Sequence, residues 1–153
     1  MQTVPNHSYK IIDKTTNEEA RLFAVDNSEF DLEILEESFK RSGLQNKVTL
    51  FKYDSKKEEG FLKLLEAPGK AIILIDYFLN GHTASEFLAK NPPLLNKHLI
   101  ITISGLQENA VINLEENKEI LRSIRYICKP PLLSELIDIV MLDSNFGIII
   151  RKE

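Results

Sequence analysis

The stretch AIILID (residues 71–76) is the most informative part of the chain, because five apolar residues lead directly to a carboxylate. A second stretch, HLIITIS (residues 98–104), is also apolar and ends in a serine. Continuous apolar runs of this length, without alternation, are typical of parallel strands that are covered on both faces. We therefore expect two buried strands, each of which delivers a polar side chain at its carboxyl end.

Strand-like and helix-like segments alternate through the chain. The segment at 28–43 has the period of a helix and begins with Ser28 and Asp31, which resemble a capping box. The repeated alternation predicts an α/β fold of the (βα)5 type, with helices on both faces of a five-stranded parallel sheet. The expected strands are 21–26, 47–53, 71–76, 98–104 and 123–129, and the expected helices are 28–43, 55–67, 83–90, 108–122 and 131–143.

Length and charge limit the possible functions. The 153 residues fit one domain, which we place at 21–143, after a flexible N-terminal tail at 1–20 and before a C-terminal extension at 144–153. Within the tail, YKII (residues 9–12) is a candidate for pairing with another segment. Within the extension, GIIIR (residues 147–151) is a candidate for an added strand or for self-association as a homodimer. The net charge of −4 argues against a nonspecific nucleic-acid surface, and no apolar run approaches the ~20 residues of a membrane span. We expect a cytoplasmic protein that contacts neither nucleic acid nor membrane.

Polar residues end four of the five expected strands. Asp26 and Asn27 follow the first strand, whereas Asp76, Ser104 and Lys129 end the third, fourth and fifth. The carboxyl ends of parallel strands share one edge of the sheet, where open α/β sheets bind ligands. Clustered carboxyl oxygens suit Mg²⁺, and a lysine offsets their repulsion. Such an edge would accept a phosphoryl group, which a free carboxylate can attack.

In order and spacing, these residues resemble the receiver domain of two-component response regulators, of the single-domain type. The resemblance covers residues 21–143 and implies a flavodoxin-like, doubly wound fold with the strand order 2-1-3-4-5. It implies that Asp76 accepts a phosphoryl group from a sensor histidine kinase or a phosphotransfer protein. A shape change then passes the signal to a downstream protein target. The implied site consists of Lys129 and Ser104 around the phosphoryl group, Ser104 and Tyr126 as switch residues, and Asp26, Asn27, Asp76 and the backbone carbonyl of Phe78 as Mg²⁺ ligands.

The sequence departs from that family at several positions. Asn27 stands where the family usually has a second acid, so we expect weaker metal binding. Leu79-Asn80 replaces Met-Pro, and Ala84 replaces a glycine. Asn80-Gly81 is also a hairpin signal, but the helix-like segment behind it leads us to expect a tight turn instead.

Each site residue also has a simpler interpretation. Asp26 and Asn27 can cap the following helix, Ser104 can belong to a turn, Tyr126 can pack in the core, and Lys129 can be an ordinary charge at a strand end. A second hypothesis for the whole chain is therefore a pseudo-receiver, a protein-interaction module that works without phosphorylation.

Enzymatic turnover is not expected. The chain contains no phosphate-binding G-x-x-x-x-G-K-[ST] loop. The general acid that a haloacid dehalogenase needs two residues after its nucleophile is replaced by Phe78. At most we expect slow self-dephosphorylation, since the apolar Phe78 and Leu106 would flank the phosphoryl group and hinder water.

Overall fold

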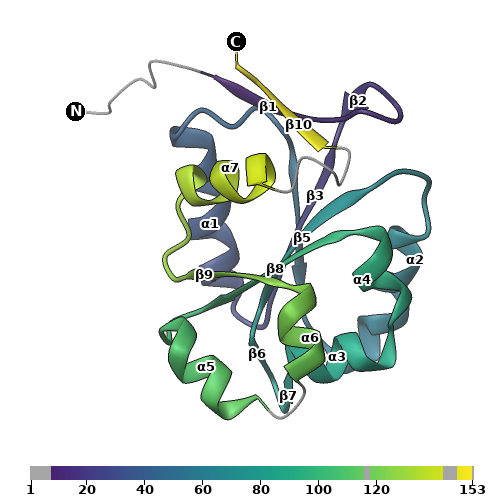
Figure 1. The fold of residues 1–153 in the computed structure, drawn as a ribbon, viewed down its shortest axis with the longest axis vertical. Coiled ribbons are helices and arrows are strands. Elements are labelled where there is room, and N and C mark those ends of the chain that lie inside the picture. The colour runs from purple at the N-terminus through teal and green to yellow at the C-terminus, as the bar shows by residue number, and fades with distance from the viewer. Residues whose placement is uncertain (1–7, 116–117, 143–147, 153) are drawn as a thin grey trace.

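A five-stranded parallel sheet forms the centre of the molecule (Figure 1). The structure is a computed structural model that describes residues 8–115, 118–142 and 148–152. All six residues of β5 and all six of β8 are buried, as their continuous apolar sequences predict. The strand order β4-β3-β5-β8-β9 confirms the doubly wound fold and the order 2-1-3-4-5. The strands are β3 (Arg21–Asp26), β4 (Val48–Lys52), β5 (Ala71–Asp76), β8 (Leu99–Ser104) and β9 (Arg125–Cys128).

Helices cover both faces of this sheet, so that neighbouring residues of one strand pack in different cores. On one face, Ala24 and Leu74 contact a cluster formed with α1 (Glu29–Arg41) and α7 (Leu133–Leu142). On the other face, Val25 and Ile75 pack in a second cluster. The elements over that second face are the 3-10 helix η1 (Ser55–Lys57), α2 (Glu58–Leu65), α3 (Ala84–Lys90), α4 (Pro93–Lys97), α5 (Glu108–Leu114) and α6 (Lys118–Ser123).

A small antiparallel sheet joins the two ends of the described chain. Its strands are β10 (Ile148–Lys152), β1 (Tyr9–Asp13) and β2 (Glu18–Glu19), in that order (Figure 1). The expectation of a flexible tail at 1–20 is therefore wrong for residues 8–20, whereas residues 1–7 lie outside the described residues. Ile11 is fully buried, and its backbone exchanges hydrogen bonds with the side chain of Asn46. The expected additional strand in the C-terminal extension is confirmed for residues 148–152, and 143–147 are not described.

Two local expectations are wrong. Asn80-Gly81 does form a hairpin, between β6 (Phe78–Leu79) and β7 (His82–Thr83), because Gly81 adopts the positive φ of +82° that the turn requires. The helix behind the hairpin forms as well, since the Thr83 side chain caps α3. The single helix expected at 108–122 is divided into α5 and α6. At the end of α5, Glu115 leaves helical geometry, and its carboxylate lies in the interior.

The start of α1 places its first turn at the carboxyl end of β3. Ser28 is the N-cap residue, and its Oγ accepts a hydrogen bond of 3.2 Å from the backbone N–H of Asp31. Leu32, Leu35 and Phe39 are buried on the inner side of the helix, as its period predicts. Among the described residues, no helix is both long and apolar enough to cross a membrane.

Candidate functional site

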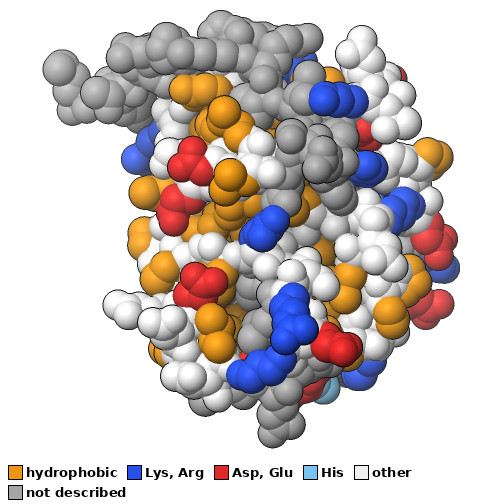
Figure 2. Space-filling view, viewed as in Figure 1, with side chains coloured by type: hydrophobic (Ala, Val, Ile, Leu, Met, Phe, Trp, Pro, Cys, Tyr) orange, Lys and Arg blue, Asp and Glu red, His pale blue; other side chains and the backbone are white. Residues whose placement is uncertain are grey.

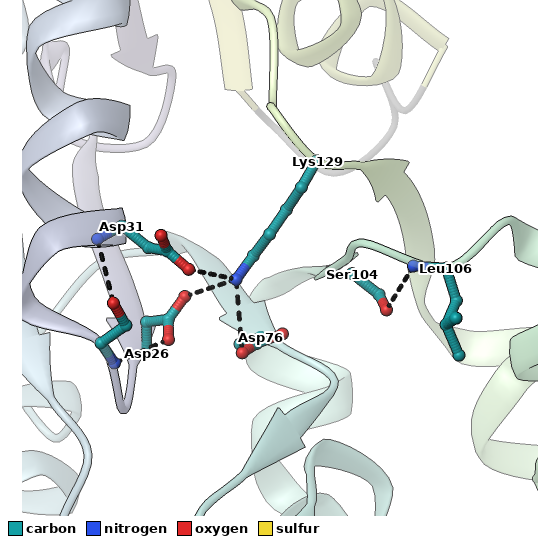
Figure 3. A network of polar contacts seen from close by, with 7 residues as sticks. Asp26, Asp31, Asp76, Ser104, Leu106 and Lys129 are labelled. Atoms are coloured by element: carbon teal, nitrogen blue, oxygen red, sulfur yellow. Dashed lines mark hydrogen bonds and ion pairs between the residues drawn. The ribbon is translucent and has the colours of Figure 1, made fainter.

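Lys129 brings together the carboxyl ends of three strands. Its Nζ atom lies 2.9 Å from Asp26 Oδ2 and 3.4 Å from Asp76 Oδ2 (Figure 3). Asp26 ends β3, Asp76 ends β5, and Lys129 follows β9, so the contact depends on the parallel arrangement of the strands. The structure thus brings together three of the site residues predicted from the sequence.

Asp31 is a member of this cluster that sequence analysis considered only as a helix cap. Lys129 Nζ donates a 2.9 Å hydrogen bond to Asp31 Oδ2, as short as its bond to Asp26 (Figure 3). The first turn of a helix that follows β3 lies at the same edge as the end of that strand, and this topology could have identified Asp31. The capping-box pattern accounts for an acid at this position by itself, so the local sequence gives no sign that its carboxylate contacts Lys129.

Asp26 combines a structural and an electrostatic role. Its Oδ1 atom accepts a 2.9 Å hydrogen bond from the backbone N–H of Ser28, while Oδ2 accepts from Lys129. The first bond shapes the turn before α1, but the N-cap residue of the helix is Ser28 and not Asp26. The second bond adds the charge of Asp26 to the cluster.

The surroundings of Asp76 raise the pKa of its carboxyl group. Burial and then the charge of Asp26 raise the pKa of Asp76 to about 6, although Lys129 and the backbone N–H of Phe78 act in the opposite direction. Burial also opposes the charge of Lys129, but the Asp26 and Asp31 carboxylates outweigh it and hold the pKa of Lys129 above its usual range. The lysine therefore carries its charge throughout the physiological range, and the negative charge around Asp76 is not fully offset.

Ser104 ends β8, and Tyr126 lies within the neighbouring strand β9, opposite Thr102. Ser104 is buried, and its Oγ accepts a 3.1 Å hydrogen bond from the backbone N–H of Leu106 (Figure 3). The Tyr126 hydroxyl donates to the backbone carbonyl of the same Leu106. Burial raises the pKa of Tyr126, while its hydrogen bond with Ser104 acts against that rise. Both residues thus contact the loop between β8 and α5, and Ser104 also acts as a turn residue.

Asn27 and Phe78 lie at the border of the site. Asn27 is exposed in the turn between β3 and α1. The side chain of Phe78 is 43 % exposed and packs edge-on against the Tyr77 ring, with the ring centroids 4.9 Å apart. The backbone N–H of Phe78 faces the Asp76 carboxylate. Of the predicted metal ligands, the structure therefore gathers Asp26 and Asp76, while the Asn27 side chain is exposed to solvent.

A cleft of about 260 Å³ opens beside the charged cluster. Asp26, Asp31, Asp76 and Lys129 line its polar part, and apolar residues of α1, β3, β5 and β8 line the rest together with Pro130 and Pro131. Oxygen donors of this kind fit a hard divalent cation such as Mg²⁺. As these side chains stand, the described part of the chain has no group of three or more His, Cys, Asp or Glu residues placed to hold a metal ion. The carboxylate oxygens of the cleft are suitable ligands for Mg²⁺, but in the structure Lys129 Nζ contacts one oxygen of each of the three carboxylates.

A second, buried polar network begins at Tyr77, directly after Asp76. The hydroxyls of Tyr77 and Ser85 both donate hydrogen bonds to Glu115 Oε2. All three residues are at least nine-tenths buried. Burial and then the contact with Glu115 raise the pKa of Tyr77 to about 12. The network connects the end of β5 with α3 and with the break between α5 and α6, and none of these contacts was predicted from the sequence.

Comparisons with solved structures agree with the fold. The structure is similar to a response regulator receiver protein from Dyadobacter fermentans, with a TM-score of 0.63, 20 % sequence identity, and coverage of 80 % of this chain and 96 % of that chain. It is also similar to the signal receiver domain of the putative response regulator NarL from Mycobacterium tuberculosis, with a TM-score of 0.58, 15 % identity, and coverage of 84 % and 98 %.

A third similar structure is the BeF3-activated receiver domain of DrrB, with a TM-score of 0.55, 18 % identity, and coverage of 83 % and 96 %. No protein-family model matches the sequence, and no curated protein matches it either. With its parallel sheet in the order β4-β3-β5-β8-β9 and its acidic cluster around Lys129, this chain has the receiver-domain fold of response regulators.

Proposed function

We propose that this chain is a response regulator receiver that accepts a phosphoryl group on Asp76. The observation that carries the proposal is the contact of Lys129 with both Asp26 and Asp76, because it places a fixed positive charge beside a carboxylate at the end of a buried strand. A side chain that is 11 % exposed and lies beside an open cleft can still meet a phosphodonor. The reaction depends on Mg²⁺, which would neutralise phosphoryl oxygens when it is bound by the carboxylates of this cleft.

The chemistry is a transfer between two nucleophiles. A carboxylate oxygen of Asp76 forms a bond to phosphorus, and the bond from phosphorus to the imidazole nitrogen of the donor breaks, with the electron pair leaving on that nitrogen. Lys129 offsets charge on the phosphoryl oxygens, and the Ser104 hydroxyl, whose oxygen accepts from the backbone N–H of Leu106, donates its hydrogen to a phosphoryl oxygen. Asp76 enters the reaction ionised, so a pKa of about 6 leaves most of it reactive at neutral pH.

The partners follow from this function. The donor is a sensor histidine kinase or a phosphotransfer protein, and the signal leaves through contact with a downstream protein, with Ser104 and Tyr126 reporting the phosphorylated state. The protein also associates with a second copy of itself through its C-terminal segment. On the face seen in Figure 2, Lys and Arg side chains are interspersed with Asp and Glu side chains, which supports a protein rather than a nucleic-acid partner. We place the protein in the cytoplasm, where these donors act.

A pseudo-receiver is the second candidate function. It is favoured by Asn27 at the position of the usual second acid and by carboxylates that Lys129 already engages. Such a protein would keep the fold as an interaction module, without phosphoryl transfer.

One experiment separates the two functions. The protein is incubated with Mg²⁺ and acetyl phosphate and then weighed by intact-mass spectrometry. We expect one added phosphoryl group on the wild type and on the control Asp138→Asn, which removes an exposed carboxylate of α7. We expect none on Asp76→Asn. A wild type that gains no mass at saturating acetyl phosphate would instead establish the pseudo-receiver.

A further inference from the structure

The cation site predicted from the sequence has one negative charge fewer than is usual in the family, because Asn27 replaces an acid. Asp26, Asp76 and Lys129 together would carry a net charge of about −1 at neutral pH. The carboxylate of Asp31 changes this balance to about −2, which matches the charge of one divalent cation. The missing charge is thus present in the folded protein, but it comes from the first turn of α1.

The position of Asp31 fits this role better than that of Asn27. Asp31 lines the cleft, together with Asp26, Asp76 and Lys129. Its side chain is 42 % exposed, so it is accessible from solvent, and its Oδ2 atom lies 2.9 Å from Lys129 Nζ. The Asn27 side chain is exposed and does not line the cleft.

The cap of α1 does not use the Asp31 carboxylate, which can therefore take part in cation binding. In a capping box, the acid at this position would accept a hydrogen bond from the backbone N–H of the cap residue. Here the N–H of Ser28 donates to Asp26 Oδ1 instead, at 2.9 Å. Asp31 contributes to the cap only through its backbone N–H, so the helix start does not need its charge.

We propose that Asp31 is the second acid of the cation site and takes the place of Asn27. In the structure Lys129 holds the Asp31 carboxylate at the cleft. When a divalent cation binds, that carboxylate turns from Lys129 to the cation or to its water shell. The inference rests on the proposed cation-dependent function, but it concerns cation binding alone and can be tested without phosphorylation.

The simpler interpretation is that an acid in the first turn merely favours the helix dipole. Glu29 supplies the matched control, because it is an exposed acid in the same turn of α1. Glu29→Gln removes the same charge at nearly the same distance from the helix end, without removing a partner of Lys129. An effect of the helix dipole or of the overall charge would appear equally in Glu29→Gln and Asp31→Asn.

The test measures Mn²⁺ binding to the unphosphorylated protein by electron paramagnetic resonance of free Mn²⁺ at constant ionic strength. We expect Asp31→Asn to bind Mn²⁺ at least about tenfold more weakly than the wild type, as for other residues that support a metal site. Asp31→Glu should recover most of the affinity, and Asn27→Ala and Glu29→Gln should bind as the wild type does. Wild-type affinity in Asp31→Asn would overturn the inference. Tighter binding would overturn it as well, since Asp31 would then only compete for Lys129.

A second measurement needs no variant. In the wild type titrated with Mg²⁺, the carboxyl ¹³Cγ signal of Asp31 should shift together with that of Asp26, while the amide ¹³Cγ signal of Asn27 stays in place. The reverse pattern would overturn the inference. Failure of the proposed function has a different signature, the absence of phosphoryl mass on Asp76, and can occur whichever residue binds the cation.

Discussion

The hydroxyl of Tyr77 donates a hydrogen bond to the buried carboxylate of Glu115, and this bond ties the residue after Asp76 to the break between α5 and α6. Ser85 donates to the same carboxylate oxygen, so one acid in the interior is held by two hydroxyl groups. Buried carboxylates need such donors, because desolvation otherwise disfavours their charge. The network therefore fixes where the α5–α6 segment meets the sheet.

Removing one of these donors should destabilise the protein. Tyr77→Phe leaves Glu115 buried with fewer partners, and we expect the free energy of unfolding to fall by about 1–3 kcal/mol. Tyr53→Phe is the control and should cost less, since the contact of the Tyr53 hydroxyl with Glu58 is long, at 3.4 Å. Urea unfolding at neutral pH measures both. If the free energy of unfolding falls equally in the two variants, the hydrogen bond from Tyr77 to Glu115 contributes no more stability than the long contact of Tyr53.

Asp76 should make the protein less stable as the pH rises. Its pKa in the folded protein, about 6, lies above the ordinary value of 3.8, so folding favours the protonated form. Its contribution to stability is present below pH 3.8 and is lost as the pH rises through about 6. We therefore expect Asp76→Asn to be more stable than the wild type above pH 6, with the difference shrinking toward pH 3.8. Urea unfolding with EDTA measures this, with Asp138→Asn as the control, and a variant that is less stable at pH 8 would contradict the prediction.

His98 should have the opposite pH dependence. Burial, followed by the charges of Lys97 and Arg21, lowers the pKa of His98 to about 4 from the ordinary value of 6.5. Its neutral Nδ1 accepts a 3.0 Å hydrogen bond from the backbone N–H of Ala71 at the start of β5. The stability that it contributes is present above pH 6.5 and is lost as the pH falls through about 4.

His98→Asn keeps an acceptor but cannot take up this proton. It should therefore lose less stability than the wild type between pH 6.5 and pH 4, as measured by thermal unfolding across that range. His82→Asn is the control, because His82 is only half-buried, and it should follow the wild type. Parallel curves for His98→Asn and the wild type would show that His98 does not titrate in this way.

Phe78 should slow hydrolysis of the phosphorylated protein. Its backbone N–H faces the Asp76 carboxylate, and its ring is 43 % exposed, so we expect the ring to hinder water that approaches a phosphoryl group on Asp76. We expect Phe78→Asn to lose its phosphoryl group faster than the wild type, because the amide can orient water. The decay of phosphoryl mass after removal of acetyl phosphate measures this. Leu64→Asn, which alters an apolar residue on α2 that is 49 % exposed, should decay at the wild-type rate. A slower or unchanged decay in Phe78→Asn would contradict the role of Phe78.

The sequence predicted the strands and helices that form because of the pattern of their own residues. The apolar run of β5 and the period of α1 are such cases, because burial on both faces or on one side of a helix leaves a direct signature. The convergence of Asp26, Asp76 and Lys129 was also predictable, since parallel strands bring their carboxyl ends together. These features follow from topology once the alternation of strands and helices is recognised.

Other features depend on partners that are distant in sequence. β1 forms because β10 and the side chain of Asn46 complete its hydrogen bonds, and the sequence near residues 9–13 does not identify these distant partners. The helix break at Glu115 depends on Tyr77 and Ser85, which are far from it in sequence. Asp31 looked like a helix cap, and only the position of Lys129 shows its second role. Tertiary contacts decide these features.

The pairing of β1 with β10 has a consequence for biosynthesis. The ribosome completes β1 early, but β10 emerges only after the whole sequence of the five-stranded sheet has been made. Until then, one edge of β1 has N–H and C=O groups that no strand covers, and such edges invite pairing with other chains. Because β10 follows the five-stranded sheet in sequence, this edge of β1 can be covered only after the residues of that sheet have been synthesised.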